Sequence, residues 1–228
     1  MTENEWRLFV SEDKWLAATD PRPMLTFLNR REYRRRIRLF AVACCRRVWD
    51  CIRDPRSQRA VEVSESFADR LVSERERELA HTAATHARSE QREQPRNDAL
   101  EAGARISWLV IFPDRRFKEV AIVTHTGSAY EYAGKGPARD EIVRLAALLR
   151  DIFGNPFRPV SADPGWLTST VVALARSIYE DRAFDRLPIL ADALQDAGCE
   201  HPDVLDHYRG SGPHARGCWV VDLLLGKQ

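Results

Sequence analysis

The sequence contains no hydrophobic run long enough to cross a bilayer. Its apolar runs, such as residues 39–45, 108–112 and 218–221, fall far short of the roughly 20 residues that a membrane helix needs. The first fifteen residues carry four acidic side chains and lack the basic stretch and apolar run of a secretion signal. The five cysteines are an odd number and form no disulfide framework. We therefore expect a cytoplasmic protein with reduced thiols and no membrane association.

Several catalytic motifs are also missing. The chain has no Gly-x-Ser-x-Gly elbow, no His-Glu-x-x-His zinc protease motif and no glycine-rich dinucleotide fingerprint. One enzymatic alternative stays open, because His214 precedes Cys218 by about one helical turn and a thiol nucleophile needs an imidazole in contact with it. We favour a non-catalytic protein, with a cysteine-dependent enzyme based on Cys218 and His214 as an alternative.

The hydrophobic pattern is mainly helical. Apolar residues recur every three or four positions in residues 33–52, 142–153, 167–178 and 187–194. Residues 106–124 break this rhythm, because two runs of strand-forming residues flank the turn-forming segment 113–116. The sequence therefore predicts a mainly α-helical bundle with a small β-hairpin insertion at residues 106–124.

The same pattern divides the chain into three regions, which are an N-terminal helical region at 1–94, a connecting segment with the hairpin at 95–139 and a C-terminal helical bundle at 140–228. A single continuous core for the two helical regions is the alternative.

Positive charge is concentrated near the N-terminus, where residues 22–59 hold twelve arginines and three acidic residues. Much of this charge lies on the predicted helix at residues 30–53, and it predicts a surface for binding a partner. We favour a protein-interaction module whose partner is unknown, with nucleic-acid binding through phosphate contacts as an alternative. The arginines assigned to this surface are Arg31, Arg34, Arg35, Arg38, Arg46 and Arg47.

A structural zinc site is a further alternative. The cysteines cluster at the two ends of the chain, at residues 44–51 and 199–218, and three histidines lie among the second cluster. Thiolate and imidazole groups are the usual ligands of structural zinc. The predicted ligands are Cys199, His207, His214 and Cys218. Cys44 and Cys45 are possible substitutes, although Cys44, like Cys51, lies in an apolar helical stripe, which favours a role in core packing.

Three parts of the sequence carry specific motifs. They are residues 15–16, 20–25 and 38–47 with Cys-Cys-Arg-Arg at 44–47, residues 148–159 with Arg-Asp-Ile-Phe-Gly-Asn-Pro-Phe-Arg-Pro, and residues 214–222 with Arg-Gly-Cys-Trp-Val-Val-Asp. These stretches resemble a multi-copy family of uncharacterised bacterial proteins. The resemblance covers roughly the first third and the last two fifths of the chain, and it departs from the alanine-rich middle of family members at residues 95–139. No activity is known for the family, so the resemblance implies a shared fold and no reaction.

Overall fold

The computed structural model describes residues 11–28, 33–93, 97–110, 118–210 and 212–227, and the secondary structure in these ranges is entirely helical. The prediction of a mainly α-helical protein is therefore confirmed. The chain forms two compact units, Met1–Ala146 and Ala147–Gln228, and helix α9 (Ala138–Phe153) contributes to both. The segment 95–139, predicted as a connection, instead supplies helices to the first unit.

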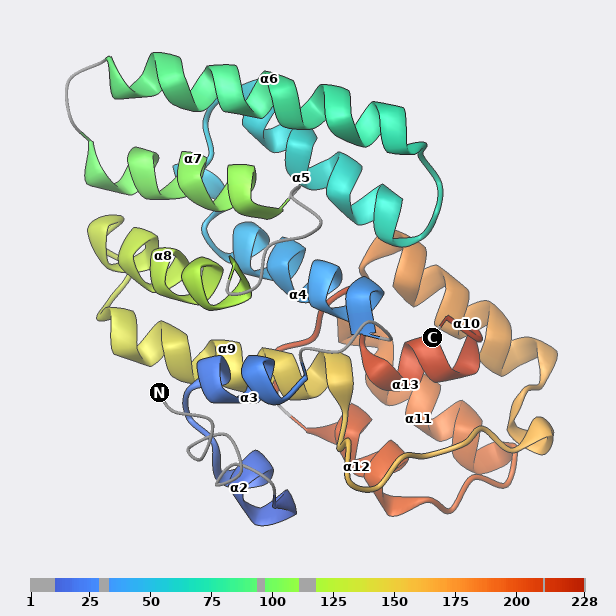
Figure 1. Ribbon diagram of the computed structural model, residues 1–228. Helices are drawn as coiled ribbons and strands as arrows, with labels where there is room; N and C mark the ends of the chain where they lie inside the picture. The colour runs from blue at the N-terminus through green and yellow to red at the C-terminus, as the bar shows by residue number, and fades with distance from the viewer. Residues whose placement is uncertain (1–10, 29–32, 94–96, 111–117, 211, 228) are drawn as a thin grey trace. The chain divides into compact units, whose positions relative to one another are not determined.

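The first unit is built from consecutive helices (Figure 1). Helix α4 contributes several buried side chains to its core, among them Leu39, Phe40 and Cys44. Helices α5, α6 and α7 lie side by side, and α8 packs against α4 and α7. The helices of this unit that precede α9 are α2 (Glu12–Ala17), α3 (Pro21–Phe27), α4 (Arg34–Arg47), the 3-10 helix η2 (Trp49–Cys51), α5 (Pro55–Ala68), α6 (Glu74–Arg92), α7 (Asp98–Val110) and α8 (Lys118–Tyr132).

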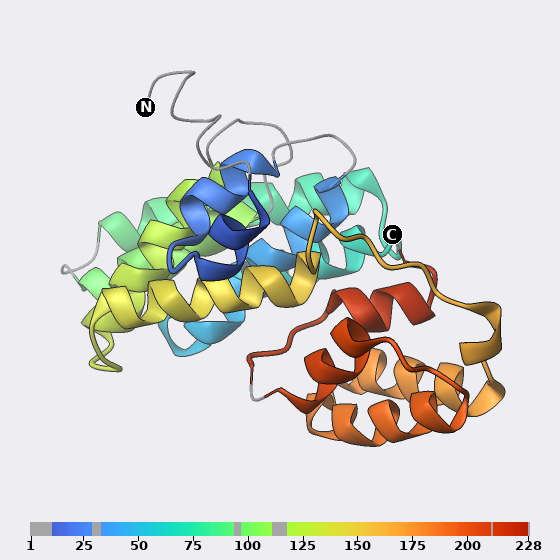
Figure 2. The ribbon, with the colours of Figure 1, turned by 90° about the horizontal axis from the view of Figure 1, so that it is seen from below.

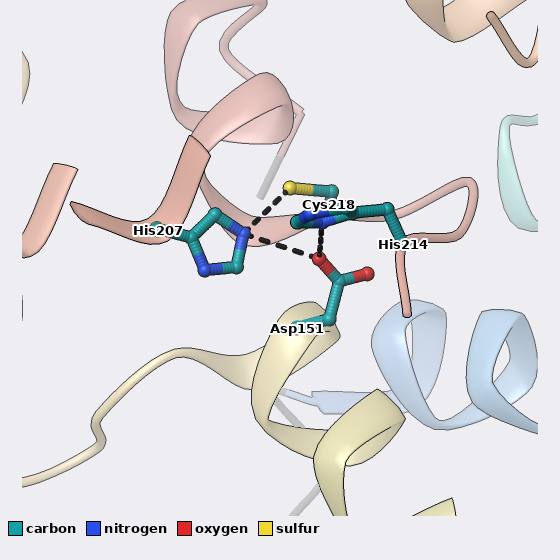
Figure 3. A group of neighbouring side chains, drawn as sticks. All are labelled: Asp151, His207, His214 and Cys218. Atoms are coloured by element: carbon teal, nitrogen blue, oxygen red, sulfur yellow. Dashed lines mark hydrogen bonds and ion pairs between the residues drawn. The ribbon is translucent and has the colours of Figure 1, made fainter. Parts of the chain in front are cut away.

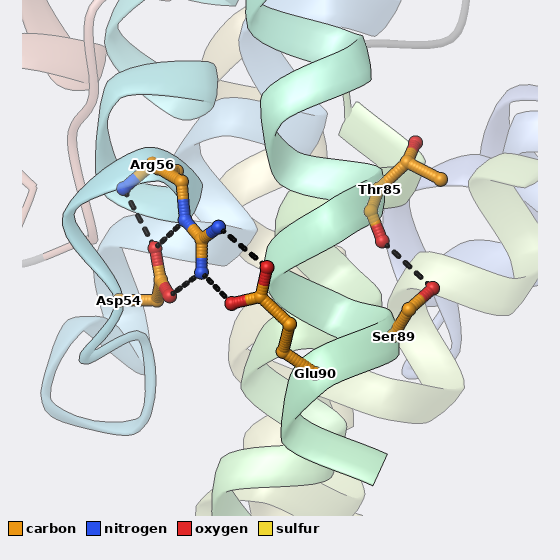
Figure 4. A network of polar contacts seen from close by, with 5 residues as sticks. All are labelled: Asp54, Arg56, Thr85, Ser89 and Glu90. Carbon is orange, nitrogen blue, oxygen red and sulfur yellow. Dashed lines mark hydrogen bonds and ion pairs between the residues drawn. The ribbon is translucent and has the colours of Figure 1, made fainter. Parts of the chain in front are cut away.

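Helix capping fixes the starts of α5 and α6. Asp54 accepts a hydrogen bond from the Arg56 backbone N–H at 2.8 Å, and Ser73 forms a capping box at the start of α6. The Arg56 guanidinium binds both Asp54 and Glu90, so it links the start of α5 to the last turns of α6 (Figure 4). Thr85, also on α6, accepts a hydrogen bond from Ser89 through its carbonyl.

The predicted β-hairpin at residues 106–124 is wrong. Residues 106–110 end helix α7 and residues 118–124 begin helix α8, while the turn predicted at 113–116 lies outside the described residues. Ile106 and Val110 are buried one helical turn apart, and the Ser64 hydroxyl donates a hydrogen bond to the Val110 carbonyl. Packing of α7 against its neighbours therefore outweighs the strand propensity of its β-branched residues.

The second unit gathers its helices around one core (Figure 2). Its core side chains come from α10, α11, α12, α13 and the segments that join them, and they include Cys199 and Cys218. The unit comprises the end of α9, the 3-10 helix η3 (Pro164–Trp166), α10 (Ser169–Asp181), the 3-10 helix η4 (Phe184–Arg186), α11 (Leu187–Asp196), α12 (Pro202–Arg209) and α13 (Trp219–Leu224).

Candidate metal centre

Four side chains of the second unit converge on one point (Figure 3). Asp151 comes from the last turn of α9 and His207 from α12, whereas His214 lies between α12 and α13 and Cys218 caps the start of α13. One potential ligand atom from each residue lies within 4.8 Å of all the others. Three separate chain segments thus bring a carboxylate, two imidazoles and a thiol together.

Two glycines shape the backbone around this point. Gly154 ends α9 with a φ of 66°, and a Cβ atom there would come within 3.1 Å of the Trp219 ring. Gly217 has a φ of 97° and precedes Cys218, whose backbone N–H donates to the Ala215 carbonyl at 2.9 Å. Because positive φ favours glycine, both turns depend on these residues. They place Asp151 and Cys218 at the ends of their helices.

The carboxylate of Asp151 is the centre of the polar contacts. His214 Nδ1 lies 2.7 Å and His207 Nε2 lies 3.1 Å from Asp151 Oδ1, and the Ala215 backbone N–H donates to Asp151 Oδ2 at 2.9 Å. His207 Nε2 is also 3.1 Å from Cys218 Sγ. Both imidazoles therefore point a ring nitrogen at the same carboxylate oxygen.

Burial and charge act differently on the two acidic groups. Burial by itself would raise the pKa of Asp151, but hydrogen bonds and charge from His207 and His214 hold that pKa below its usual value. Burial, followed by the negative charge of Asp151, raises the pKa of Cys218 well above 9.0. Without a bound metal ion, Asp151 is therefore an ionised carboxylate and Cys218 is a neutral thiol.

This donor set fits a transition-metal ion. In tetrahedral zinc sites, ligand bonds of about 2.0–2.3 Å place neighbouring donor atoms about 3.3–3.6 Å apart. The three contacts at 2.7, 3.1 and 3.1 Å need to widen by about 0.2–0.6 Å to reach that range, and any of the remaining separations near the 4.8 Å limit needs to shrink. One carboxylate and one thiolate also balance the charge of a divalent ion, which limits the penalty of burying it.

The arrangement differs from a cysteine–histidine–carboxylate catalytic triad. In a triad, the nucleophile and the carboxylate contact opposite nitrogens of one imidazole. Here Asp151 and Cys218 both contact Nε2 of His207. Reactive thiols are also partly exposed and have lowered pKa values, whereas Cys218 is fully buried and the pKa of its thiol is raised. The geometry thus argues against Cys218 as a nucleophile with His214 or His207 as its base.

Three of the four predicted zinc ligands, His207, His214 and Cys218, lie in the cluster. The fourth, Cys199, does not; it packs in the core of the second unit with 1% of its surface exposed. Asp151 takes its place. Sequence reasoning missed Asp151, although a signal exists: this acidic residue lies three positions after the buried Leu148, on the apolar side of a helix.

Cys44 and Cys45, considered as substitute ligands, are buried in helix α4 of the first unit. Burial raises the pKa of both thiols, so both are neutral. The described part of the chain has no other group of three or more histidine, cysteine, aspartate or glutamate side chains that converge in this way.

The arginines predicted to bind a partner differ in their surroundings. Arg31 lies outside the described residues, and Arg34 is exposed at the start of α4. The Arg38 guanidinium lies 4.8 Å above the Phe67 ring in a cation–π contact.

Two further arginines of this set form ion pairs within the first unit. Arg35 binds Asp69 at 3.0 Å, and Arg46 binds Glu65 at 3.1 Å while it stacks on the Trp49 ring. Both carboxylates are almost completely buried. These pairs compete with phosphate binding, so they weaken the nucleic-acid hypothesis, which stays a prediction.

Arg47 is the last residue of this set, and its guanidinium forms a two-pronged ion pair with Glu141. Glu141 is completely buried, and Arg144 lies 3.6 Å from it. This pair joins α4 to α9 inside the first unit. Its role in the described structure is therefore to neutralise a buried carboxylate.

Comparisons of this chain with protein-family models, curated proteins and solved structures give no match. The resemblance to a bacterial family therefore stays a prediction, and the functional argument rests on the geometry alone. None of the described helices combines the length and the apolar character needed to cross a membrane.

Proposed function

We propose that the second unit is a zinc-binding module in which Asp151, His207, His214 and Cys218 hold one structural ion. The convergence of four donor atoms within 4.8 Å carries this proposal. Binding would release the Cys218 thiol proton to solvent, because the thiolate is the form that coordinates metal. Each imidazole would present an unprotonated ring nitrogen to the ion and keep its proton on the other nitrogen.

The donor chemistry favours zinc over the common alternatives. Calcium and magnesium prefer sites made of oxygen ligands, whereas two imidazoles and a thiolate suit Zn²⁺. The separation of His214 and Cys218 by four positions is also typical of a local ligand pair in structural zinc sites. Copper binds similar ligands more tightly, so metal availability also decides which ion is found.

The burial of the site supports a structural role. Asp151 and Cys218 are almost completely buried, and the imidazoles expose only 17% and 11% of their surfaces. Four protein ligands leave no open position for water or substrate in a tetrahedral site. The ion would connect the end of α9 to α12 and to the start of α13.

Elemental analysis tests the proposal. The full chain is purified without a histidine tag and without added metal, and its zinc content is measured together with that of His207→Ala, Cys218→Ser and the control His86→Ala. His86 is exposed on α6, outside the cluster. We expect about one zinc per chain in the natural protein and in the control, and little in the two cluster variants. An equal metal content in all four proteins, or zinc-free protein that does not take up added Zn²⁺, would contradict a zinc site here.

A further inference from the structure

The imidazole of His207 lies among other rings. Its Nε2 atom makes the polar contacts with Asp151 and Cys218 (Figure 3). Its ring centroid lies 5.1 Å from that of His214 and 5.5 Å from that of Trp219, with the ring planes inclined at 81° and 60°. His214 belongs to the candidate metal centre, whereas Trp219 directly follows Cys218 in the sequence. Trp219 is therefore a ring outside the cluster that packs against one of the candidate ligands.

The orientation of the His207 ring is not fixed in the usual way. A metal-binding histidine usually donates its second ring N–H to a carboxylate, a backbone carbonyl or a water molecule, and this bond orients the ring. Among the residues that the structure describes, none accepts a hydrogen bond from His207 Nδ1, and the polar contacts with them all involve Nε2. Rotation about the Cβ–Cγ bond of a histidine has broad minima. The orientation of this ring therefore depends on packing against its neighbours.

Trp219 is itself held against the backbone that ends α9. Gly154 follows Asp151 by three positions, and a Cβ atom at Gly154 would lie 3.1 Å from Cγ and Cδ2 of the indole. Such a distance is shorter than ordinary van der Waals contact, so the indole comes this close because glycine has no side chain. One indole therefore contacts both the chain segment that carries Asp151 and the imidazole of His207.

We propose that Trp219 is a positioning residue that holds the His207 imidazole with Nε2 toward the bound metal and thereby slows release of the ion. This inference rests on the proposed zinc site. An ion leaves when a ligand detaches and turns away before it can bind again, so a ring that is held in its bound orientation retains the ion longer. The half-buried indole also limits the access of water to this ligand. Removing the indole should therefore speed dissociation of the ion although all four ligands remain.

Loss of cobalt to a chelator tests this role, because Co²⁺ replaces zinc in tetrahedral sites and the strong absorption of such a site fades when the ion leaves. The full chain and the variants Trp219→Leu and Trp219→Phe are loaded with Co²⁺ and mixed with excess EDTA. We expect Trp219→Leu to lose Co²⁺ about tenfold faster than the natural protein, since outer-shell groups contribute about 10–100-fold to metal affinity. Trp219→Phe keeps an aromatic ring, so its rate should fall between the two.

Trp166→Leu is the matched control. Trp166 packs against the same hydrophobic core as Trp219, and in the described part of the chain it makes no ring contact with the candidate metal centre. Its replacement removes the same apolar volume from the unit, so it should lower the free energy of unfolding without changing the rate of Co²⁺ loss. Unfolding in urea without metal measures the destabilisation of each variant.

The outcomes separate this inference from the proposed site. If the natural protein binds neither Co²⁺ nor Zn²⁺, the metal site itself is wrong, and the role of Trp219 falls with it. If the natural protein and Trp219→Leu lose Co²⁺ at the same rate, the site stands and the role of Trp219 is refuted. The role is also refuted if Trp166→Leu, at an equal loss of stability, speeds release as much as Trp219→Leu does.

A second pair of variants serves if Trp219→Leu does not fold. Gly154→Ala places a methyl group against the indole, whereas the new Cβ atom of Gly198→Ala meets no described atom within 4 Å beyond its chain neighbours. Both glycines have a positive φ, 66° and 84°, so the backbone strain is similar. We expect faster Co²⁺ loss from Gly154→Ala than from Gly198→Ala, and equal rates would overturn the inference.

Discussion

Replacement of Asp151 by asparagine is the most direct probe of the candidate centre, because it removes a charge and keeps the volume of the side chain. Both carboxylate oxygens are acceptors: Oδ1 faces His207 and His214, and Oδ2 accepts the Ala215 backbone N–H at 2.9 Å. Asparagine has one carbonyl oxygen and one amide group. With its amide group toward Ala215, asparagine leaves the Ala215 N–H without an acceptor; with the amide group toward the histidines, the imidazoles must change tautomer to accept from it.

The expected loss of stability in Asp151→Asn has two parts. Without metal, one buried donor without an acceptor lowers the free energy of unfolding by about 1–3 kcal/mol. With zinc, the natural protein gains a further contribution that depends on free metal, about 2.7 kcal/mol when the free concentration is one hundred times the dissociation constant. A neutral amide is a poor ligand for zinc, so Asp151→Asn should gain much less. The difference in stability between the two proteins should thus widen when zinc is added.

Hydrogen exchange measured by mass spectrometry suits this test, because it reports on the second unit separately from the first. Peptides that cover residues 199–225 are followed with zinc and with a chelator, and Asp196→Asn serves as the control. Asp196 is exposed at the end of α11, so its replacement should change protection by no more than about 0.5 kcal/mol. If Asp151→Asn loses the same protection with zinc as with chelator, the carboxylate stabilises the fold but does not hold a metal. If it loses none, the hydrogen-bond reasoning is also refuted.

Three further predictions concern the protein without metal. Arg47→Met should lower the free energy of unfolding in urea by about 3 kcal/mol, because it leaves the buried Glu141 with only the more distant Arg144; an unchanged midpoint contradicts this. Gly103→Ala should lower the melting temperature of the first unit, since its Cβ atom would come within 2.1 Å of the Cys51 carbonyl oxygen, and unchanged melting would mean that the two backbones are farther apart. All five cysteines are buried, so a thiol reagent should label them only after denaturation; rapid labelling of the folded protein argues against this burial.

The sequence predicts helices well where local signals and packing agree. Asp54 followed by a proline, and Ser73 followed by Glu76, are capping signals at the starts of α5 and α6, and Gly154 ends α9. The same reasoning fails for residues 106–124. The strand propensity of isoleucine and valine in this segment depends only on residue type. The burial of Ile106 and Val110 depends on contacts with helices that are distant in the sequence. Single-sequence propensity cannot include contacts with residues as distant as Ser64.

The candidate centre shows a similar limit. His207, His214 and Cys218 lie within twelve consecutive residues, so residue type and spacing are enough to group them. Asp151 lies far earlier in the sequence and joins them only because α9 ends against the segment before α13. Cys199 is closer in sequence to the other three residues than Asp151 is, and a thiolate is a more usual zinc ligand than a carboxylate. Cys199 nevertheless packs in the hydrophobic core of the second unit and does not join the cluster. Residue type thus limits which side chains could be ligands, and the path of the chain determines which of them come together.

Burial alone does not decide what a cysteine does in this protein. Cys44 is as completely buried as Cys218 and Cys51 is nearly so, and burial is also the first cause of the raised pKa values of Cys44 and Cys51. Cys51 donates a weak hydrogen bond to a backbone carbonyl, which suits a small residue that fills space. Cys218 instead has an imidazole nitrogen 3.1 Å from its sulfur and shares that nitrogen with a buried carboxylate. A thiol that costs this much to ionise becomes a thiolate only when a cation replaces its proton, so the burial that makes Cys218 inert as a nucleophile is still compatible with a ligand in a closed metal site.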